Sequence, residues 1–288
     1  MKIALGTVQF GMEYGVANQA GRVKLVDVKS ILELAASKGV DTLDTAIAYG
    51  DSETVLGQAG VDEWQVVTKL PAVPDGVSDI TAWVTAQLEG SLNRLGIRHL
   101  HGVLLHRPDQ LLGKDGRAIV YALQHMKALG YTRKIGVSAY SPEDIDMLAG
   151  ILHLDLVQAP LNILDRRLVV SGCAQRLKDQ GTEVHVRSAF LQGLLLMPES
   201  SRPEKFQRWN TLWGHWHQWL RESSLTAVQA CLAYATSVQE VDRIVVGVDS
   251  LTHLNEILTS SHARLGTLPD FAQLVNADLI NPSLWNQL

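Results

Sequence analysis

Four side chains suited to acid–base chemistry come at, or just after, short apolar runs. Asp44 and Tyr49 follow the first such run, Lys69 ends a second and His106 ends a third. A carboxylate near the end of a buried strand is costly unless a cation or a hydrogen-bond donor meets it, so we expect Lys69 to pair with Asp44. Each residue alone has an ordinary structural explanation. A carboxylate, a phenol, an ammonium and an imidazole at successive strand ends together predict proton-transfer chemistry.

The elements that would carry these residues alternate between strand and helix. Apolar runs predict strands at residues 3–6, 40–45, 65–69, 101–105, 134–137, 154–158, 184–187 and 243–246. Caps, helical spacing and closing glycines predict helices at residues 26–37, 53–59, 78–95, 118–129, 141 onward, 168–179, 224–236 and 250–258.

Eight strand–helix units favour a closed (β/α)8 barrel, the TIM barrel, with residues 1–288 forming one domain. An open doubly wound sheet is the rival fold. It would want a glycine-rich dinucleotide fingerprint after its first strand, and Gly6–Gly11 does not match one. The one long insertion, 197–222, falls between the seventh strand and its helix. In a barrel the carboxyl ends of the strands meet on one face, which would gather the four acid–base residues there.

The composition narrows the class of protein. The chain has 288 residues, of which 46% are hydrophobic and 19% charged, and a net charge of −5. Scattered Lys and Arg argue against a nucleic-acid surface, and no apolar run reaches membrane-spanning length. Two cysteines cannot form a disulfide framework, and the N-terminal stretch has no signal-peptide pattern. We therefore expect a protein of the reducing cytoplasm.

The motifs, taken in order, resemble the aldo-keto reductase superfamily. The matching pieces are Gly6-Thr7 with Phe10-Gly11, Asp44-Thr45-Ala46 with Tyr49-Gly50 and Ser52-Glu53, Lys69, Leu105-His106-Arg107, Ile135-Gly136-Val137-Ser138, Val157-Gln158, Gly193-Leu194 and Val246-Gly247. The resemblance implies an NAD(P)H-dependent oxidoreductase that reduces an aldehyde or ketone to an alcohol, with sugar-type carbonyls among the candidates.

By this resemblance, Asp44, Tyr49, Lys69 and His106 match the family's catalytic tetrad. Tyr49 would be the general acid. A free phenol has a pKa of about 10, and a cation such as Lys69 beside it would lower that value. Asp44 would keep Lys69 charged and aimed, and His106 would orient the carbonyl oxygen. This chemistry needs no metal.

The resemblance also implies a nicotinamide cofactor lying across the barrel mouth. The implied contacts are Gly6, Thr7, Val8 and Asp44 at the first two strand ends, Ser138 and Gln158 at the carboxamide, Arg187 at the nicotinamide ring, Ser188, Phe190, Leu191 and Gly193 around the pyrophosphate, and Gly247, Val248, Ser250 and His253 at the adenosine end.

Three positions depart from the family pattern. Ala139 replaces a common Asn, and Ile257 replaces an Asn that often follows the position of Glu256. Asp249 stands where many members carry a basic residue that clamps the 2′-phosphate of NADP. The family default is NADP(H), but an acid at this position disfavours phosphate, so NAD(H) is the alternative.

The insertion contains Trp209, Trp213, Trp216 and Trp219, spaced to share one helical face. We favour a packing stripe over an aromatic wall above the substrate. Two other functions compete with the reductase: a Schiff-base lyase that uses Lys69 as nucleophile, and a cofactor-binding regulatory subunit. The complete tetrad favours the enzyme. We expect a monomer, the common state of the family.

Overall fold

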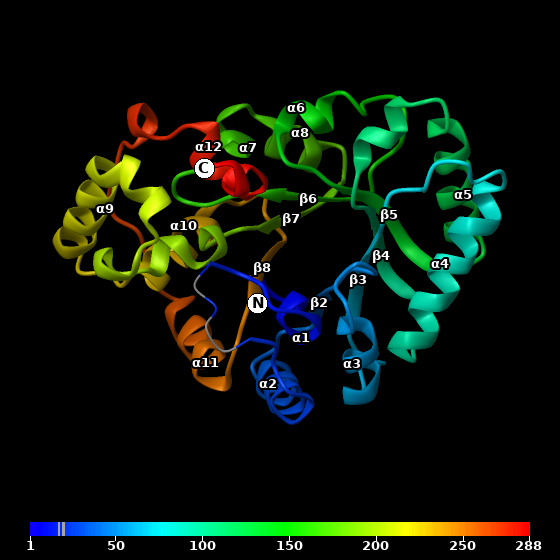
Figure 1. The fold of residues 1–288 in the computed structure, drawn as a ribbon, viewed down its shortest axis with the longest axis horizontal. Coiled ribbons are helices and arrows are strands. Elements are labelled where there is room, and N and C mark those ends of the chain that lie inside the picture. The colour runs from blue at the N-terminus through cyan, green and yellow to red at the C-terminus, as the bar shows by residue number, and fades with distance from the viewer. Residues whose placement is uncertain (17, 19–20) are drawn as a thin grey trace.

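The computed structural model describes residues 1–16, 18 and 21–288, and residues 17, 19 and 20 lie outside the description. Parallel strands pair in chain order and close into a barrel (Figure 1), which confirms the predicted TIM barrel. The strands are β1 (Ile3–Gly6), β2 (Thr42–Asp44), β3 (Gln65–Leu70), β4 (Leu100–Leu105), β5 (Thr132–Ser138), β6 (Leu156–Pro160), β7 (Glu183–Arg187) and β8 (Arg243–Gly247).

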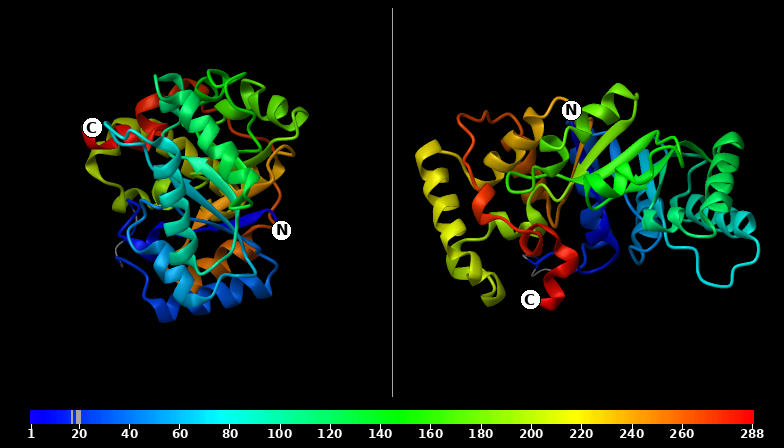
Figure 2. Two further views of the ribbon diagram at one scale, coloured as in Figure 1. Left: turned by 90° about the vertical axis from the view of Figure 1, so that its right-hand side faces the viewer. Right: turned by 90° about the horizontal axis from the view of Figure 1, so that it is seen from above.

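Helices form the outer layer around the strands (Figures 1 and 2). They are α1 (Val8–Gly11), α2 (Leu25–Ser37), α3 (Ser52–Ala59), α4 (Ile80–Leu95), α5 (Gly116–Ala128), α6 (Pro142–Asp146), α7 (Arg167–Val170), α8 (Cys173–Asp179), α9 (Asn210–Ser223), α10 (Ala227–Ser237), α11 (Leu251–Ser260) and α12 (Ala277–Ile280).

Local sequence explains where several helices begin and end. Asp79 caps α4, because its carboxylate accepts a hydrogen bond from the Ala82 N–H, and Gly96 ends this helix in the left-handed conformation. Ser141 and Asp144 form a capping box at α6, with Pro142 in the first turn. These helix boundaries are therefore set by capping residues and a glycine that can be recognised in the sequence.

Two helices differ from prediction. The helix expected over 168–179 is interrupted, because Gly172 adopts φ 70° and separates α7 from α8. The helix expected from residue 224 begins at Ala227 instead, because Ser224 is left-handed and closes α9, while Thr226 caps α10. Both differences arise from a left-handed residue that periodicity alone does not reveal.

Strand register brings the predicted acid–base residues to one end of the barrel. Asp44 pairs with Gly6 and Val67, while Lys69 pairs with Leu104. Below them, the side chains of Val67, Leu104 and Leu156 form a separate small apolar cluster. The interior of the barrel beneath the polar groups is thus filled by packed apolar side chains and is not an open pore.

The Trp-rich insertion packs as a structural element at the flank of the molecule (Figures 1 and 2). Trp209, Trp213 and Trp216 are buried, and the Trp216 indole donates to Leu195 O at 3.1 Å. The molecule has a cavity at the carboxyl ends of the strands, and among the described residues none of the four Trp side chains lines it. The packing interpretation is therefore the one that the burial supports.

Across the described residues, no helix combines the length and the apolar character that crossing a membrane would require.

Candidate active site

A buried ion pair forms the centre of the site. Lys69 Nζ lies 2.6 Å from Asp44 Oδ2 and also donates to Thr45 O at 2.9 Å. Only 1% of the Lys69 side chain is exposed. Burial alone would lower the Lys69 pKa, but the neighbouring Asp44 and Tyr49 outweigh it and raise this pKa above its usual value. The ammonium is thus held charged and fixed in place.

The Tyr49 loop brings the phenol ring against this ion pair. Lys69 Nζ lies 5.0 Å from the centre of the Tyr49 ring. Two glycines allow the loop to come close to the segment after β1: a Cβ on Gly11 would meet Tyr49 O at 1.8 Å, and Gly50 has φ 54°. Any side chain at Gly11 would therefore push Tyr49 away from Lys69.

His106 completes the group from the end of β4. Its ring meets the Tyr49 ring edge to face, with 5.9 Å between the centroids. Burial, together with the Lys69 charge, lowers the His106 pKa to about 4. The imidazole is therefore neutral near pH 7 and can donate one hydrogen bond to a ligand oxygen. All four acid–base residues predicted from the sequence thus lie together.

The Ser52-Glu53 part of the motif supports this site from behind. Ser52 Oγ donates to Thr7 O at 2.9 Å, which ties the start of α3 to the end of β1. Glu53 is buried and accepts from Thr68, Ser91 and Arg94. Neither Asp51 nor Ser52 makes a side-chain cap at the start of α3. These polar residues instead fix α3 against β3 and α4.

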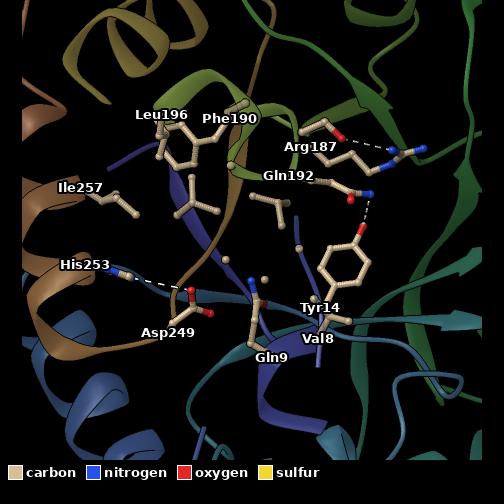
Figure 3. A pocket seen from close by; sticks show the side chains of 18 of the residues that line it. Val8, Gln9, Tyr14, Arg187, Phe190, Gln192, Leu196, Asp249, His253 and Ile257 are labelled. Carbon is tan, nitrogen blue, oxygen red and sulfur yellow. Dashed lines mark hydrogen bonds and ion pairs between the residues drawn. The ribbon is translucent and has the colours of Figure 1, made fainter. Parts of the chain in front are cut away.

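A cavity of about 600 Å³ opens beside the tetrad (Figure 3). Its lining includes most of the cofactor-binding residues predicted from the sequence: Gly6, Thr7, Val8, Asp44, Gln158, Arg187, Ser188, Phe190, Gly193, Gly247 and His253. Four others lie outside the lining. Leu191 and Val248 are buried in the core, Ser138 is buried in β5, and the Ser250 side chain caps α11.

The loop after β7 curls around one side of this cavity with an unusual backbone. Ser188, Leu191 and Gln192 have φ of 61°, 49° and 53°, and Gly193 has φ 89°. Left-handed conformations at non-glycine residues are strained and collect at ligand-binding segments. The concentration of such residues here marks the loop as a candidate binding element.

Arg187 adopts a geometry that the sequence did not predict. Its guanidinium donates to Ala139 O at 3.0 Å and lies 4.7 Å from the centre of the Tyr140 ring. One face of the planar group is therefore covered by Tyr140. The residue still belongs to the cavity lining, and it is the only Lys or Arg found there among the described residues.

Other lining residues were missed by the sequence reasoning. Tyr14 and Gln192 join across the cavity, because Gln192 Nε2 donates to the Tyr14 hydroxyl at 3.0 Å (Figure 3). Gln9 and Thr226 also line the cavity. Tyr14, Gln192 and Thr226 come from distant segments without a periodic pattern, and Gln9 comes from the short helix α1. Only the nearness of Gln9 to the Gly6-Thr7 motif offered a signal.

The cavity presents buried polar atoms that suit a polar ligand. Gln9 Oε1, Gln158 Oε1 and Asp249 Oδ1 have no hydrogen-bond partner within the described part of the chain. Leaving such an atom unsatisfied costs roughly 1–3 kcal/mol, so native proteins rarely do it without a ligand or water nearby. The residues present therefore fit an elongated molecule rich in hydrogen-bonding groups, such as a dinucleotide.

Solved structures share this fold. An aldo-keto reductase from Bacillus halodurans superposes with a TM-score of 0.74 at 19% identity, covering 98% of this chain and 95% of that one. The glycerol dehydrogenase of Gluconobacter oxydans gives a TM-score of 0.69 at 20% identity, covering 92% and 88%. At these identities the likeness concerns the fold alone.

Sequence comparison identifies relatives and a family in addition to the fold. L-glyceraldehyde 3-phosphate reductase of Escherichia coli O157:H7 is 25% identical over 255 residues, 79% of this chain and 70% of the relative. The 6-dehydroglucose reductase of Agrobacterium fabrum (strain C58 / ATCC 33970) is 29% identical over 199 residues, 62% and 66% respectively. The model of the Aldo/keto reductase family matches residues 2–274. The chain therefore belongs to the aldo/keto reductase family.

Proposed function

We propose that this protein binds a nicotinamide dinucleotide in the large cavity and reduces the carbonyl group of an aldehyde or ketone. The observation that carries the proposal is the contact of a buried, charged Lys69 with both Asp44 and the Tyr49 ring, with neutral His106 edge-on to Tyr49. This arrangement places a proton donor, Tyr49, in the lining of the cavity and a hydrogen-bond donor, His106, next to it.

The roles follow from what each group can do. A bound reduced cofactor would supply a hydride to the carbonyl carbon. His106 orients the carbonyl oxygen, and the Tyr49 hydroxyl gives that oxygen its proton, so that the carbonyl becomes an alcohol. Lys69 stabilises the phenolate left on Tyr49 until solvent returns a proton, and Asp44 holds Lys69 in position.

The cofactor would lie along the lining already described. Gln158 Oε1 is available to accept from a carboxamide, since its amide nitrogen is committed to Asp44 at 2.6 Å. The curled backbone at Ser188–Gly193 would follow the pyrophosphate. The last residues of the lining, around Asp249 and His253, would take the adenosine.

Sugar-type carbonyl compounds are the substrates we propose. The support is that two relatives are named for reductions of L-glyceraldehyde 3-phosphate and of 6-dehydroglucose. The test is the loss of reduced-nicotinamide absorbance with simple aldehydes, triose phosphates, and free or nucleotide-linked keto-sugars. Turnover that is highest with a sugar carbonyl supports the proposal, and no turnover with any carbonyl overturns it.

The two competing functions fit less well. A Schiff-base lyase needs a neutral Lys69, whereas its surroundings raise the Lys69 pKa. Borohydride trapping with substrate would detect such an enzyme. A regulatory subunit would bind cofactor without turnover, so the absorbance assay separates it from a reductase.

A further inference from the structure

The end of the cavity at the start of α11 is lined by an amide, an imidazole and two carboxylates. Gln9, Asp249, His253 and Glu256 line it, and Asp249 lies within 3.8 Å of His253 (Figure 3). Gln9 comes from α1 and the others from β8–α11, so two distant segments of the chain meet here. No hydrogen bond or ion pair between described residues joins these four side chains to Tyr49, Lys69 or His106, so we consider their chemistry in terms of binding rather than of proton transfer.

Two buried hydrogen-bond acceptors at this end have no partner. Asp249 Oδ1 and Gln9 Oε1 are both unpaired among the described residues, and both residues line the cavity. The Gln9 amide lies close to the backbone of Gly247, where an added Cβ would meet Gln9 Nε2 at 2.3 Å. Acceptors need donors, and a hydroxyl group can donate where an ionised phosphate cannot.

Cationic side chains are directed away from this end. Arg187 is the only Lys or Arg in the described lining, and it is held by Ala139 O and the Tyr140 ring. Arg243, in β8, bonds to Thr42 and Asp41 instead. His253 is half exposed, and the carboxylates of Asp249 and Glu256 share the lining with it. A phosphate here would meet two carboxylates and no fixed cation.

Building on the proposed dinucleotide site, we propose that this end selects NAD(H) over NADP(H), with Asp249 and Gln9 accepting hydrogen bonds from the adenosine ribose hydroxyls. The 2′-phosphate of NADP(H) would replace one of these donors with negative charge beside Asp249. The N-terminus of α11 favours an anion, but its first turn carries no basic residue besides His253 to reinforce it.

The first test is binding, measured by calorimetry without substrate. NADH and NADPH are titrated into the protein, and so are adenosine 5′-diphosphate and adenosine 2′,5′-bisphosphate, which differ at the ribose. We expect NADH to bind at least tenfold more tightly than NADPH, with the same order for the two adenosine nucleotides. Equal affinities, or tighter NADPH binding, overturn the selectivity.

The second test changes the acceptors. Asp249→Arg is expected to raise the preference for NADPH by tenfold or more, because a charge-assisted contact replaces a repulsion. Gln9→Leu is expected to weaken NADH more than NADPH. Asp62→Asn, an exposed carboxylate outside the lining, is the matched control and should leave the ratio unchanged. An unchanged ratio in Asp249→Arg also overturns the selectivity.

These outcomes separate this inference from the function on which it rests. If both dinucleotides bind with equal affinity and a carbonyl is reduced, the selectivity fails while the reductase stands. If neither dinucleotide binds, the proposed function fails and the selectivity falls with it.

Discussion

The two ends of the barrel interior each hold a carboxylate that is largely shielded from solvent, but the surroundings of the two carboxylates differ. At the amino end of β7, Glu183 accepts from His101 at 3.0 Å, from His185 at 2.7 Å and from Lys134. Burial alone would raise the Glu183 pKa, yet these donors hold it well below its usual range. Both oxygens of this carboxylate are therefore occupied by donors from three strands.

At the carboxyl end, Asp44 is paired as tightly, with Lys69 and Gln158. The difference is that Tyr49 stands next to this cluster and a large cavity opens beside it. Gln158 keeps one unpartnered oxygen and His185 one unpartnered nitrogen among the described residues, but of the two only Gln158 belongs to the lining of this cavity. None of Glu183, His101, His185 and Lys134 lines that cavity, whereas the Asp44 cluster ends on a phenol and on the cavity and can therefore act on a ligand. Buried charge alone therefore does not identify the site.

The largest expected effect is on catalysis. Tyr49→Phe should lower kcat by roughly two to four orders of magnitude, the range for losing a positioned acid. Dinucleotide affinity and melting temperature should stay close to wild type, because only one hydroxyl is removed. Tyr121→Phe, at an exposed tyrosine, is the control. Near-native turnover in Tyr49→Phe would remove the distinction drawn between the two ends.

The second expected effect is a loss of stability caused by a substitution at the amino end of the barrel. Glu183→Gln should lower the free energy of unfolding by about 3 kcal/mol at neutral pH, because it breaks a buried network. The kcat of the folded enzyme should change little, since no hydrogen bond between described residues joins His185 to Gln158, its neighbour in register. Urea denaturation and steady-state kinetics measure the two quantities, with the exposed Glu63→Gln as control.

The pH dependence gives this prediction a sign. The Glu183 pKa is depressed in the folded state, so its stabilisation is present above the unfolded value of about 4.3 and is lost as pH falls toward the folded value. The deficit of Glu183→Gln should therefore be full at pH 7 and shrink below about pH 4. A deficit independent of pH would mean that the carboxylate charge does not stabilise the amino end.

Sequence reasoning recovered the carboxyl end better than the amino end, for a physical reason. Asp44, Lys69 and His106 each end an apolar run, and parallel strands in a barrel bring such ends together. Glu183 and His185 lie at the beginning of a strand, where nothing in the run distinguishes them. The Tyr14–Gln192 contact depends on the conformation of segments without a periodic pattern, and Gln9 lies in α1, a helix of four residues that is too short to show helical periodicity in the sequence.

A third, smaller effect concerns His106. With a pKa of about 4, this imidazole should stay neutral from pH 5 to 8, and kcat/KM should show no inflection from it near pH 6.5. Lys69→Met removes a charge that depresses this pKa, so the pKa should rise. NMR titration of His106 in both proteins measures the change. If His106 in the wild-type protein titrates near pH 6.5, the carboxyl end is more accessible to solvent than the burial of Lys69 suggests.

The smallest expected effect tests whether the two ends are as separate as their contacts suggest. Arg243 lies only six residues before Asp249 in sequence, yet its guanidinium donates to Thr42 Oγ1 at 3.0 Å and reaches Asp41 at 3.2 Å. Asp41 is about half exposed, so the ion pair is screened by solvent. Arg243→Gln should therefore lower the free energy of unfolding by only about 1 kcal/mol, mostly through the lost Thr42 contact.

The ratio of NADH to NADPH affinity should not change, because Arg243 does not reach the adenosine end of the cavity. Calorimetry and urea denaturation on this one variant measure both quantities. A shift of the ratio toward NADH would mean that Arg243 contributes to phosphate binding, and the cofactor end could then no longer be described as free of fixed cations.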